Sequence, residues 1–332
     1  MHITFFDLYS WEKREIRKQL KDHHLELFCE SVSMEILEKV KNTEVISGFI
    51  YSTFGKKEID MLPKLKMITT RSTGYDHIDV EYCKKKGIAL CTVPFYGENT
   101  VAEHTFALML SLSRNVHKSY IRSQQGNFSI DGLMGFDLKD KTLGVIGAGK
   151  IGQHVIRIAK GFGMEVLAYD PFQNELLSEV LDFKYADLDT ILEKSDILTI
   201  HVPYNKATHH LIGCHNVQAI KKGALLINTA RGAIVETSAL LTGLESGIIA
   251  GAGLDVLEGE HMIMEEKELL HHERTKEQLE EFAMNYQLIH RDDVVFTPHI
   301  AFYSKEALER IINTTIENIQ AFASGKSQNA VS

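Results

Sequence analysis

Three residues suited to carboxylate binding and proton transfer follow separate apolar runs in the second half of the chain. Arg231 comes directly after the run at 224–228, and Glu260 and His299 each come after a later run. An arginine fork can hold a carboxylate through two parallel hydrogen bonds. A histidine, with an ordinary pKa near ~6.5, can donate or accept a proton at neutral pH, and a neighbouring carboxylate favours its protonated form. Together they predict a site that binds a carboxylate and moves a proton.

Each of these residues also has a structural interpretation. Arg231 could cap or salt-bridge a helix, Glu260 could be one more acid in an acidic loop, and His299 could bond a backbone carbonyl. Their shared position favours a site, because open parallel α/β sheets bind ligands beyond the carboxyl ends of their strands. We therefore predict Arg231 as the carboxylate anchor, His299 as the acid/base and Glu260 as its partner.

The segment 142–170 predicts a dinucleotide site. An apolar strand leads into Gly147, Gly149 and Gly152, a helical pattern follows, and a second strand ends at Asp170. The first glycine permits a tight turn, the second allows close approach to a pyrophosphate, and the third allows close packing of helix and strand. The helix N-terminus favours phosphate, and Asp170 is placed to accept hydrogen bonds from a ribose. An ordinary βαβ turn would not need this order of parts, so we expect NAD as cofactor.

Composition limits the other possibilities. The 332 residues are 44% hydrophobic and 24% charged, with a net charge of −9, which indicates a globular protein and argues against nucleic-acid binding. The basic cluster Lys84–Lys86 is interpreted as a solvated helix end. No apolar run is long enough to cross a bilayer, no signal peptide is evident, and the four cysteines show no framework spacing. We expect a cytoplasmic protein with no membrane partner.

The fold class predicted is α/β, with two doubly wound parallel-sheet (Rossmann-like) domains and an interdomain cleft. The first domain would comprise residues 1–98 plus 299–332 and bind substrate; residues 99–298 would form the NAD-binding domain. A capping box from Thr100 to Glu103 would open an apolar helix at 102–112. Expected strands are 2–6, 25–28, 45–51, 67–70, 88–91, 143–146, 165–169, 197–202, 224–228, 249–254 and 294–297; expected helices include 10–20, 34–40 and 304–322, with surface helices in 258–293.

The motifs resemble those of the D-isomer-specific 2-hydroxyacid dehydrogenases, and within that family the bacterial D-lactate dehydrogenase branch. The matching segments are RSTGYDHID at 71–79, VPFYGENTVAEH at 93–104, TLGVIGAGKIG at 142–152, HVP at 201–203, NTARG at 228–232, LDVLEGE at 254–260 and TPHIAFY at 297–303. The resemblance implies a homodimeric enzyme that uses NADH to reduce pyruvate to D-lactate. It also implies that Glu260, not Glu258, is the catalytic glutamate.

The resemblance further implies two sets of binding residues. Around the dinucleotide, besides the glycines and Asp170, it places Lys150, Ile151, Val202, Pro203, Thr208, Thr229, Ala230 and Asp255. For the substrate it implies backbone contacts from Ser72, Thr73 and Gly74 to the carboxylate, the side chain of Arg231, and pocket walls from Tyr96, Phe302 and Tyr303, with Phe54 as a further wall. The alternative for these aromatic residues is ordinary core filling.

Other interpretations stay open at this point. The scaffold could act on another D-2-hydroxy acid or on phosphite, or the chain could be a non-catalytic, NAD-sensing corepressor-like protein. His209, His210, Cys214 and His215 have spacings that could hold zinc, but their segment resembles one that carries no metal in the family, so we expect no metal site. His104 is interpreted as a packed interdomain residue.

Overall fold

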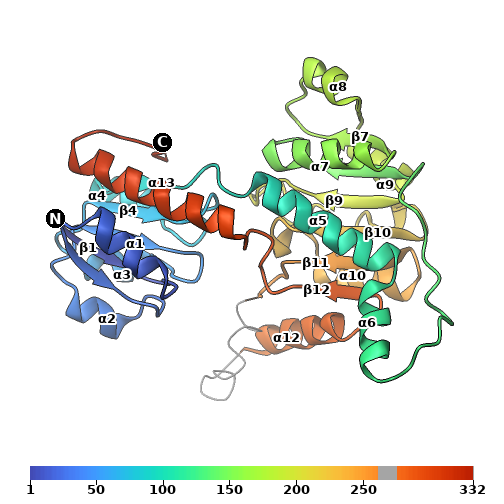
Figure 1. Ribbon diagram of the computed structural model, residues 1–332, viewed down its shortest axis with the longest axis horizontal. Helices are drawn as coiled ribbons and strands as arrows, with labels where there is room; N and C mark the ends of the chain where they lie inside the picture. The colour runs from blue at the N-terminus through green and yellow to red at the C-terminus, as the bar shows by residue number, and fades with distance from the viewer. Residues whose placement is uncertain (261–274, 332) are drawn as a thin grey trace. The chain divides into compact units, whose positions relative to one another are not determined.

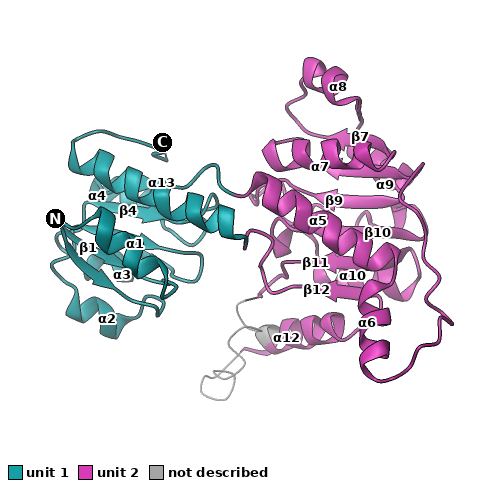
Figure 2. Ribbon diagram, viewed as in Figure 1, with its two compact units in different colours: residues 1–96, 304–332 teal, residues 97–303 magenta. Residues whose placement is uncertain are grey.

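A computed structural model describes residues 1–260 and 275–331. The chain forms two compact units, residues 1–96 with 304–332, and residues 97–303 (Figure 2). The expected boundaries were at 98/99 and 298/299, so His299 and the residues up to 303 belong to the second unit and not to the first. The cause is local, since backbone groups of this segment bond Asp255, as described below.

The first unit is built on a parallel sheet. Among the described residues its strand order is β2-β1-β3-β4-β5. The strands are β1 (His2–Phe5), β2 (His24–Leu27), β3 (Val45–Gly48), β4 (Met67–Thr70) and β5 (Ala89–Cys91); the helices are α1 (Glu12–Gln19), α2 (Met34–Lys39), α3 (Lys56–Asp60), α4 (Val80–Lys86) and α13 (Lys305–Ala323). The central strands β3 and β4 are buried along their whole length, as expected for strands covered on both faces.

Apolar side chains on the two faces of this sheet form separate core clusters. Helix α13, at the end of the chain, packs against α1 and β4 (Figure 1), and Ile312, Ile316 and Ile319 join the cluster that contains Ile3. On the other face, the side chain of Phe54 is fully buried and packs against Phe6. The prediction that Phe54 lines a substrate pocket is therefore wrong, because this ring fills the core.

The second unit contains a larger parallel sheet. Within the described ranges the strand order is β12-β11-β10-β9-β6-β7-β8. The strands are β6 (Thr142–Ile146), β7 (Glu165–Tyr169), β8 (Lys184–Tyr185), β9 (Ile197–Ile200), β10 (Ala224–Asn228), β11 (Ile249–Leu254) and β12 (Val294–Phe296). The helices are α5 (Glu98–Ser113), α6 (Val116–Gln124), α7 (Lys150–Gly161), α8 (Glu175–Leu181), α9 (Leu188–Lys194), α10 (Thr237–Glu245) and α12 (Lys276–Ile289), with short 3-10 turns η1 (Val217–Ala219) and η2 (Gly232–Ile234).

Two expectations for this unit need correction or restriction. Helix α5 begins at Glu98 after the N-cap Gly97, so Thr100 lies inside the helix and the predicted capping box does not exist. The Asn99 amide instead donates to Glu103 one turn later. Of the surface helices expected in 258–293, α12 is present, while residues 261–274 lie outside the described residues.

The order of strands creates one switch point. Strand β6 lies between β7 and β9. The chain first extends the sheet from β6 through β7 to β8, then returns to β9 on the other side of β6 and extends the sheet to β12. Ligands of open α/β sheets bind beyond the carboxyl ends of the strands at such a point. The glycine loop follows β6, and Arg231, Glu260 and His299 follow β10, β11 and β12 at the same edge. In the part of the chain that the structure describes, no helix is long and apolar enough to span a membrane.

Candidate active site

His299 and Glu260 form a hydrogen-bonded pair. Nδ1 of the imidazole lies 2.7 Å from Oε1 of Glu260, and the two side chains are 16% and 25% exposed. The other carboxylate oxygen of Glu260 accepts the N–H of Leu257 at 3.2 Å, which fixes the glutamate to its own loop. A carboxylate on Nδ1 orients the ring. Nε2 is then the nitrogen placed to exchange a proton with a substrate.

Asp255 holds the backbone that carries His299. Its side chain is 1% exposed and accepts the N–H groups of Ile300 at 3.0 Å and Ala301 at 2.8 Å, together with the Thr297 hydroxyl. The His299 N–H donates to the Asp255 carbonyl at 2.9 Å. This support matters because His299 has φ +53°, a left-handed conformation that costs a residue with a side chain some stability.

His104 belongs to this same network. Its Nε2 lies 2.9 Å from the Thr297 hydroxyl and 3.4 Å from the Asp255 carboxylate. Helix α5, which carries His104, is part of the second unit, so this residue braces the His299 loop from within that unit. Its packing against the first unit stays a prediction. Neither Thr297 nor His104 could be assigned to the site from spacing, because their partners lie far away in the sequence.

Arg231 lies on a tight turn between β10 and η2. The side-chain amide of Asn228 donates to the Arg231 carbonyl at 2.9 Å, and its oxygen accepts the Ala230 N–H at 3.0 Å. A Cβ on Gly232 would stand 2.0 Å from the backbone of Leu257, so only glycine lets this turn pack on the loop after β11. That close approach brings the Arg231 turn against the loop that carries Glu260. Arg231 Nη1 donates to the Ala230 carbonyl at 2.8 Å.

A second glutamate on the same loop, Glu258, also pairs with a histidine. Glu258 Oε1 is 2.7 Å from His210 Nε2, and Oε2 accepts the Thr237 hydroxyl at 3.2 Å and its N–H at 3.4 Å. The Glu258 carbonyl accepts the buried amide of Asn285 at 2.7 Å. Glu258 thus connects its loop to the segments that carry His210, Thr237 and Asn285. Glu260 is the glutamate that contacts His299.

The glycine loop has the space that a dinucleotide needs. Gly147 has φ +104°, and a Cβ there would stand 2.8 Å from the backbone of His201; a Cβ on Gly152 would stand 2.0 Å from the Gly147 carbonyl oxygen. By contrast, a Cβ on Gly149 would meet nothing within 4 Å, which leaves the approach to the α7 N-terminus open. Asp170 accepts the Ala148 N–H at 2.9 Å and so connects the end of β7 to this loop.

Most of the other residues expected around the dinucleotide lie at the start of α7 or directly after β9 and β10. Lys150 and Ile151 begin α7; Val202 and Pro203 follow β9; Thr208 hydrogen-bonds the Pro203 carbonyl at 2.7 Å; and Thr229 and Ala230 follow β10. The HVP motif also contains His201, but burial lowers the pKa of its imidazole to about 3, and the ring lies 2.9 Å from the Thr199 hydroxyl. Because the His201 imidazole is neutral and already hydrogen-bonded, His299 is kept as the acid/base candidate.

In the first unit, the turn Ser72–Gly74 follows β4. The Ser72 hydroxyl donates to the Gly74 carbonyl at 2.6 Å, and the Thr73 hydroxyl to the Val93 carbonyl at 2.9 Å. Within the described residues, the backbone N–H groups of these three residues donate no hydrogen bond. Unsatisfied N–H groups gathered in one turn can bind an anion such as a carboxylate.

The expected aromatic wall residues differ in exposure. Phe302 is buried at 5%, with its ring edge-on to Tyr303 and its centroid 6.4 Å from that of His299. Tyr303 is 48% exposed, and Tyr96 is partly buried with its carbonyl accepting Arg310 Nε at 2.7 Å. Phe302 is therefore placed beside the acid/base candidate, and its contact with any substrate would be limited to the little surface it exposes.

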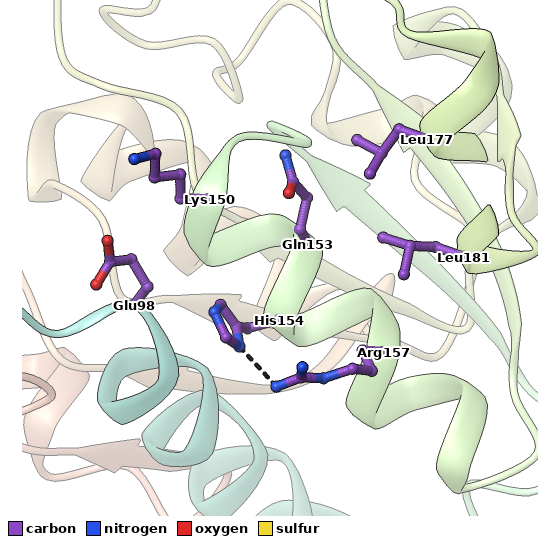
Figure 3. Close-up of a pocket in the computed structure, with 7 residues that line it drawn as sticks. All are labelled: Glu98, Lys150, Gln153, His154, Arg157, Leu177 and Leu181. Atoms are coloured by element: carbon purple, nitrogen blue, oxygen red, sulfur yellow. Dashed lines mark hydrogen bonds between the residues drawn. The ribbon is translucent and has the colours of Figure 1, made fainter. Parts of the chain in front are cut away.

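No metal site is formed among the described residues, which contain no cluster of three or more histidine, cysteine or acidic ligands. His209 stacks on His210 with centroids 3.9 Å apart, and Cys214 donates its N–H to Glu236. A hollow of about 340 Å³ lies beside α7, lined by Glu98, Lys150, Gln153, His154, Arg157, Leu177 and Leu181 (Figure 3). Lys150 is its only member among the expected dinucleotide residues, and Arg231, Glu260 and His299 are not part of it.

Comparison with known proteins assigns this chain to a family. Residues 106–301 match the D-isomer specific 2-hydroxyacid dehydrogenase NAD binding domain. The D-lactate dehydrogenase of Escherichia coli is 31% identical, with 98% of each chain covered, and an aromatic 2-oxoacid reductase of Clostridium sporogenes is 35% identical over 90% of this chain and 89% of its own. The chain belongs to the D-isomer-specific 2-hydroxyacid dehydrogenase family. It is an NAD-dependent oxidoreductase of that family.

A solved structure supports the same assignment. The D-lactate dehydrogenase of Aquifex aeolicus, complexed with NAD and lactic acid, is 38% identical, with a TM-score of 0.88 and coverage of 97% of this chain and 96% of its own. The predicted two-domain parallel α/β fold and the NAD cofactor are confirmed. The relatives differ in substrate, so the family does not fix which 2-oxo acid this chain reduces.

Proposed function

We propose that this dehydrogenase reduces pyruvate to D-lactate with NADH. The observation that carries the proposal is the 2.7 Å pair of His299 and Glu260 on a loop packed against the Arg231 turn. This arrangement supplies a cation for a carboxylate and an oriented proton donor at the edge of the sheet where the glycine loop also ends.

Each residue has a defined task in this mechanism. NADH, held at the glycine loop and the N-terminus of α7, would supply the hydride for the carbonyl carbon. Arg231 binds the substrate carboxylate through its fork and draws electron density from the carbonyl oxygen. His299 donates a proton from Nε2 to that oxygen, while Glu260 holds the imidazolium through Nδ1. The N–H groups of Ser72, Thr73 and Gly74 supply further donors to the carboxylate.

The expected preference for a small side chain depends on three aromatic residues. We assign Tyr96, Phe302 and Tyr303 as walls that leave room for a methyl group. The position of Phe302 beside the His299 ring supports this assignment, because a substrate whose oxygen meets His299 would bring its side chain near the same ring. A longer or aromatic side chain would then be disfavoured on steric grounds.

A substrate panel tests the proposal. NADH oxidation is measured with pyruvate, 2-oxobutyrate, phenylpyruvate, 4-methyl-2-oxopentanoate and hydroxypyruvate, with NAD-dependent phosphite oxidation as a control, and the lactate formed is assigned by its chirality. We expect the highest kcat/KM for pyruvate and D-lactate as product. A higher kcat/KM for another 2-oxo acid, or for phosphite, would replace the substrate; NADH binding without turnover of any of them would favour a sensing role.

We also propose that the protein is a homodimer. Large apolar side chains are concentrated in the arm formed by α6 and the residues up to 136: Tyr120, Phe128, Ile130 and Met134 are 65%, 79%, 82% and 94% exposed. Exposed apolar side chains gathered in one segment are typical of an association site. A second copy is the proposed partner. Sedimentation should give a dimer for the wild type and a monomer when Phe128, Ile130 and Met134 are all replaced by serine; a monomeric wild type would contradict the proposal.

The cytoplasm is the proposed location. The four cysteines, all of them within the described residues, form no disulfide, which suits a reducing compartment. Fractionation of the source cells should place the protein with reduced thiols in the soluble cytoplasmic fraction. Recovery with an exported fraction would contradict this location.

A further inference from the structure

The side chain of Arg71 is buried inside the first unit. It is 1% exposed, and its Nη2 donates to the carbonyls of Phe6 at 2.8 Å and Asp7 at 2.7 Å, while Nη1 donates to the Ser47 hydroxyl at 3.3 Å. Arginine is rarely buried so completely unless its charge and donors are paired. The partners therefore define what this guanidinium does.

Those partners lie at the carboxyl ends of neighbouring strands. Arg71 itself follows β4, Ser47 lies in β3, and Phe6 and Asp7 follow β1, so the side chain reaches from one central strand across the next to a third. The backbone of Arg71 also donates to the Gly48 carbonyl at 2.9 Å. One residue thus connects three adjacent strand ends at the same edge of the sheet.

Acidic side chains balance the buried charge. Glu12 is 2% exposed and accepts the Tyr9 N–H at 2.7 Å. Burial raises the pKa of Glu12, and the positive charge of Arg71 opposes this effect. Asp7 accepts the N–H of Phe49 at 2.9 Å. Burial lowers the pKa of Arg71, and the negative charges of Glu12 and Asp7 oppose this effect.

The Ser72–Gly74 turn begins at the residue after Arg71. Its other side is attached to the segment after β5, where the Val93 N–H donates to the Ser72 carbonyl at 3.1 Å and the Thr73 hydroxyl donates to the Val93 carbonyl at 2.9 Å. The turn is therefore held between Arg71 and Val93. Its backbone N–H groups, described above, have directions that depend on these two attachments.

We propose that Arg71 is a positioning residue that sets the affinity for the carboxylate of the 2-oxo acid by fixing the Ser72–Gly74 turn, without touching the substrate. The inference rests on the proposed function of that turn. Hydrogen-bond donors must be held close to their productive geometry to bind an anion well, and residues outside direct contact can supply that restraint. The effect should fall on substrate affinity and leave the dinucleotide, bound by the second unit, unaffected.

Substitution of Arg71 separates positioning from folding. Arg71→Met removes the clamp. Arg71→Lys keeps the charge that Asp7 and Glu12 need, although one nitrogen cannot reproduce a planar fork that serves three acceptors. The exposed Arg17 of α1, changed to Met, is the matched control in the same unit. For each protein the readouts are KM and kcat for pyruvate, affinity of the NADH complex for oxamate, affinity for NADH alone, and thermal unfolding by circular dichroism.

We expect the pyruvate KM and the oxamate dissociation constant to rise about tenfold or more in Arg71→Met and by a smaller factor in Arg71→Lys, with NADH affinity unchanged within about twofold. If Arg71→Met does not fold, Arg71→Lys decides the matter. A folded Arg71→Lys with wild-type KM and oxamate affinity would overturn the positioning role and leave the proposed function intact. A wild type that binds NADH but neither turns over pyruvate nor binds oxamate would overturn the proposed function and this inference with it.

Discussion

Two glutamates on the loop after β11, Glu258 and Glu260, each pair with a histidine from another segment, and the two pairs have nearly the same local geometry. The His210–Glu258 and His299–Glu260 pairs both measure 2.7 Å, and in each the histidine has a positive φ, +50° and +53°. Their side chains are also similarly exposed, at 32% and 21% against 16% and 25%. Neither the distance nor the burial distinguishes a catalytic pair from a structural one.

The surroundings of the two pairs do differ. Glu258 accepts the Thr237 hydroxyl and N–H with its second oxygen, so that pair joins the start of α10 to the loop. Glu260 bonds only its own loop and His299 among the described contacts, and the backbone around His299 is fixed separately by Asp255. A pair that joins elements is interpreted as structural, whereas a pair whose backbone is held by other groups leaves its imidazole available for chemistry.

Replacing the two histidines should give the largest contrast. His299→Gln removes the proton donor, so turnover should fall by roughly 10² to 10⁴ while NADH binding is retained. His210→Gln, the matched control, should keep kcat within about threefold, since its described ring contacts are with Glu258 and His209 and not with the catalytic pair. Steady-state kinetics and NADH titration measure both variants. Equal losses of turnover in the two would remove the distinction between the pairs.

The second contrast concerns the arginine next to the catalytic loop. Arg231→Lys keeps the charge but loses the fork, so kcat/KM for pyruvate should fall roughly 10-fold to 100-fold with little change in NADH affinity. The control is Arg291→Lys, because Arg291 bonds Asp293 with two nitrogens at 2.8 Å within the same unit. That variant should change stability and not substrate affinity. Near wild-type kcat/KM in Arg231→Lys would show that another group anchors the carboxylate.

The sequence allowed the central strands, and the edge of the sheet where the candidate catalytic residues lie, to be predicted for a physical reason. Buried parallel strands are short apolar runs, and the residues after them must meet at one edge, so Arg231 and His299 could be grouped before any contact was known. The support around them could not be predicted, because Thr297, His104 and Asp255 meet through packing and not through spacing. Phe54 was misjudged for the same reason, since a motif does not show which side of a strand end a ring occupies.

A third contrast compares the two glutamates by turnover. The Glu260 carboxylate orients the His299 ring through its contact with Nδ1. An amide in its place orients the ring less well, so kcat for pyruvate should fall roughly tenfold in Glu260→Gln, with NADH affinity unchanged. Glu258→Gln should keep kcat within about twofold of the wild type. A wild-type kcat in Glu260→Gln would show that Glu260 does not act through His299.

Glu258→Gln should have the smallest effect on catalysis. Its effect on stability is the clearest test of a structural pair. The amide cannot accept from both His210 and Thr237 as a carboxylate does, so the free energy of unfolding should fall by about 1 kcal/mol, as for loss of one typical hydrogen bond. For a unit of this size that corresponds to a Tm lower by roughly 2–4 °C. Thermal unfolding of the NADH-free protein measures it, with Glu260→Gln as the comparison. If Glu260→Gln lowers the Tm more than Glu258→Gln, Glu260 also stabilises the fold, and the two pairs differ less than their surroundings suggest.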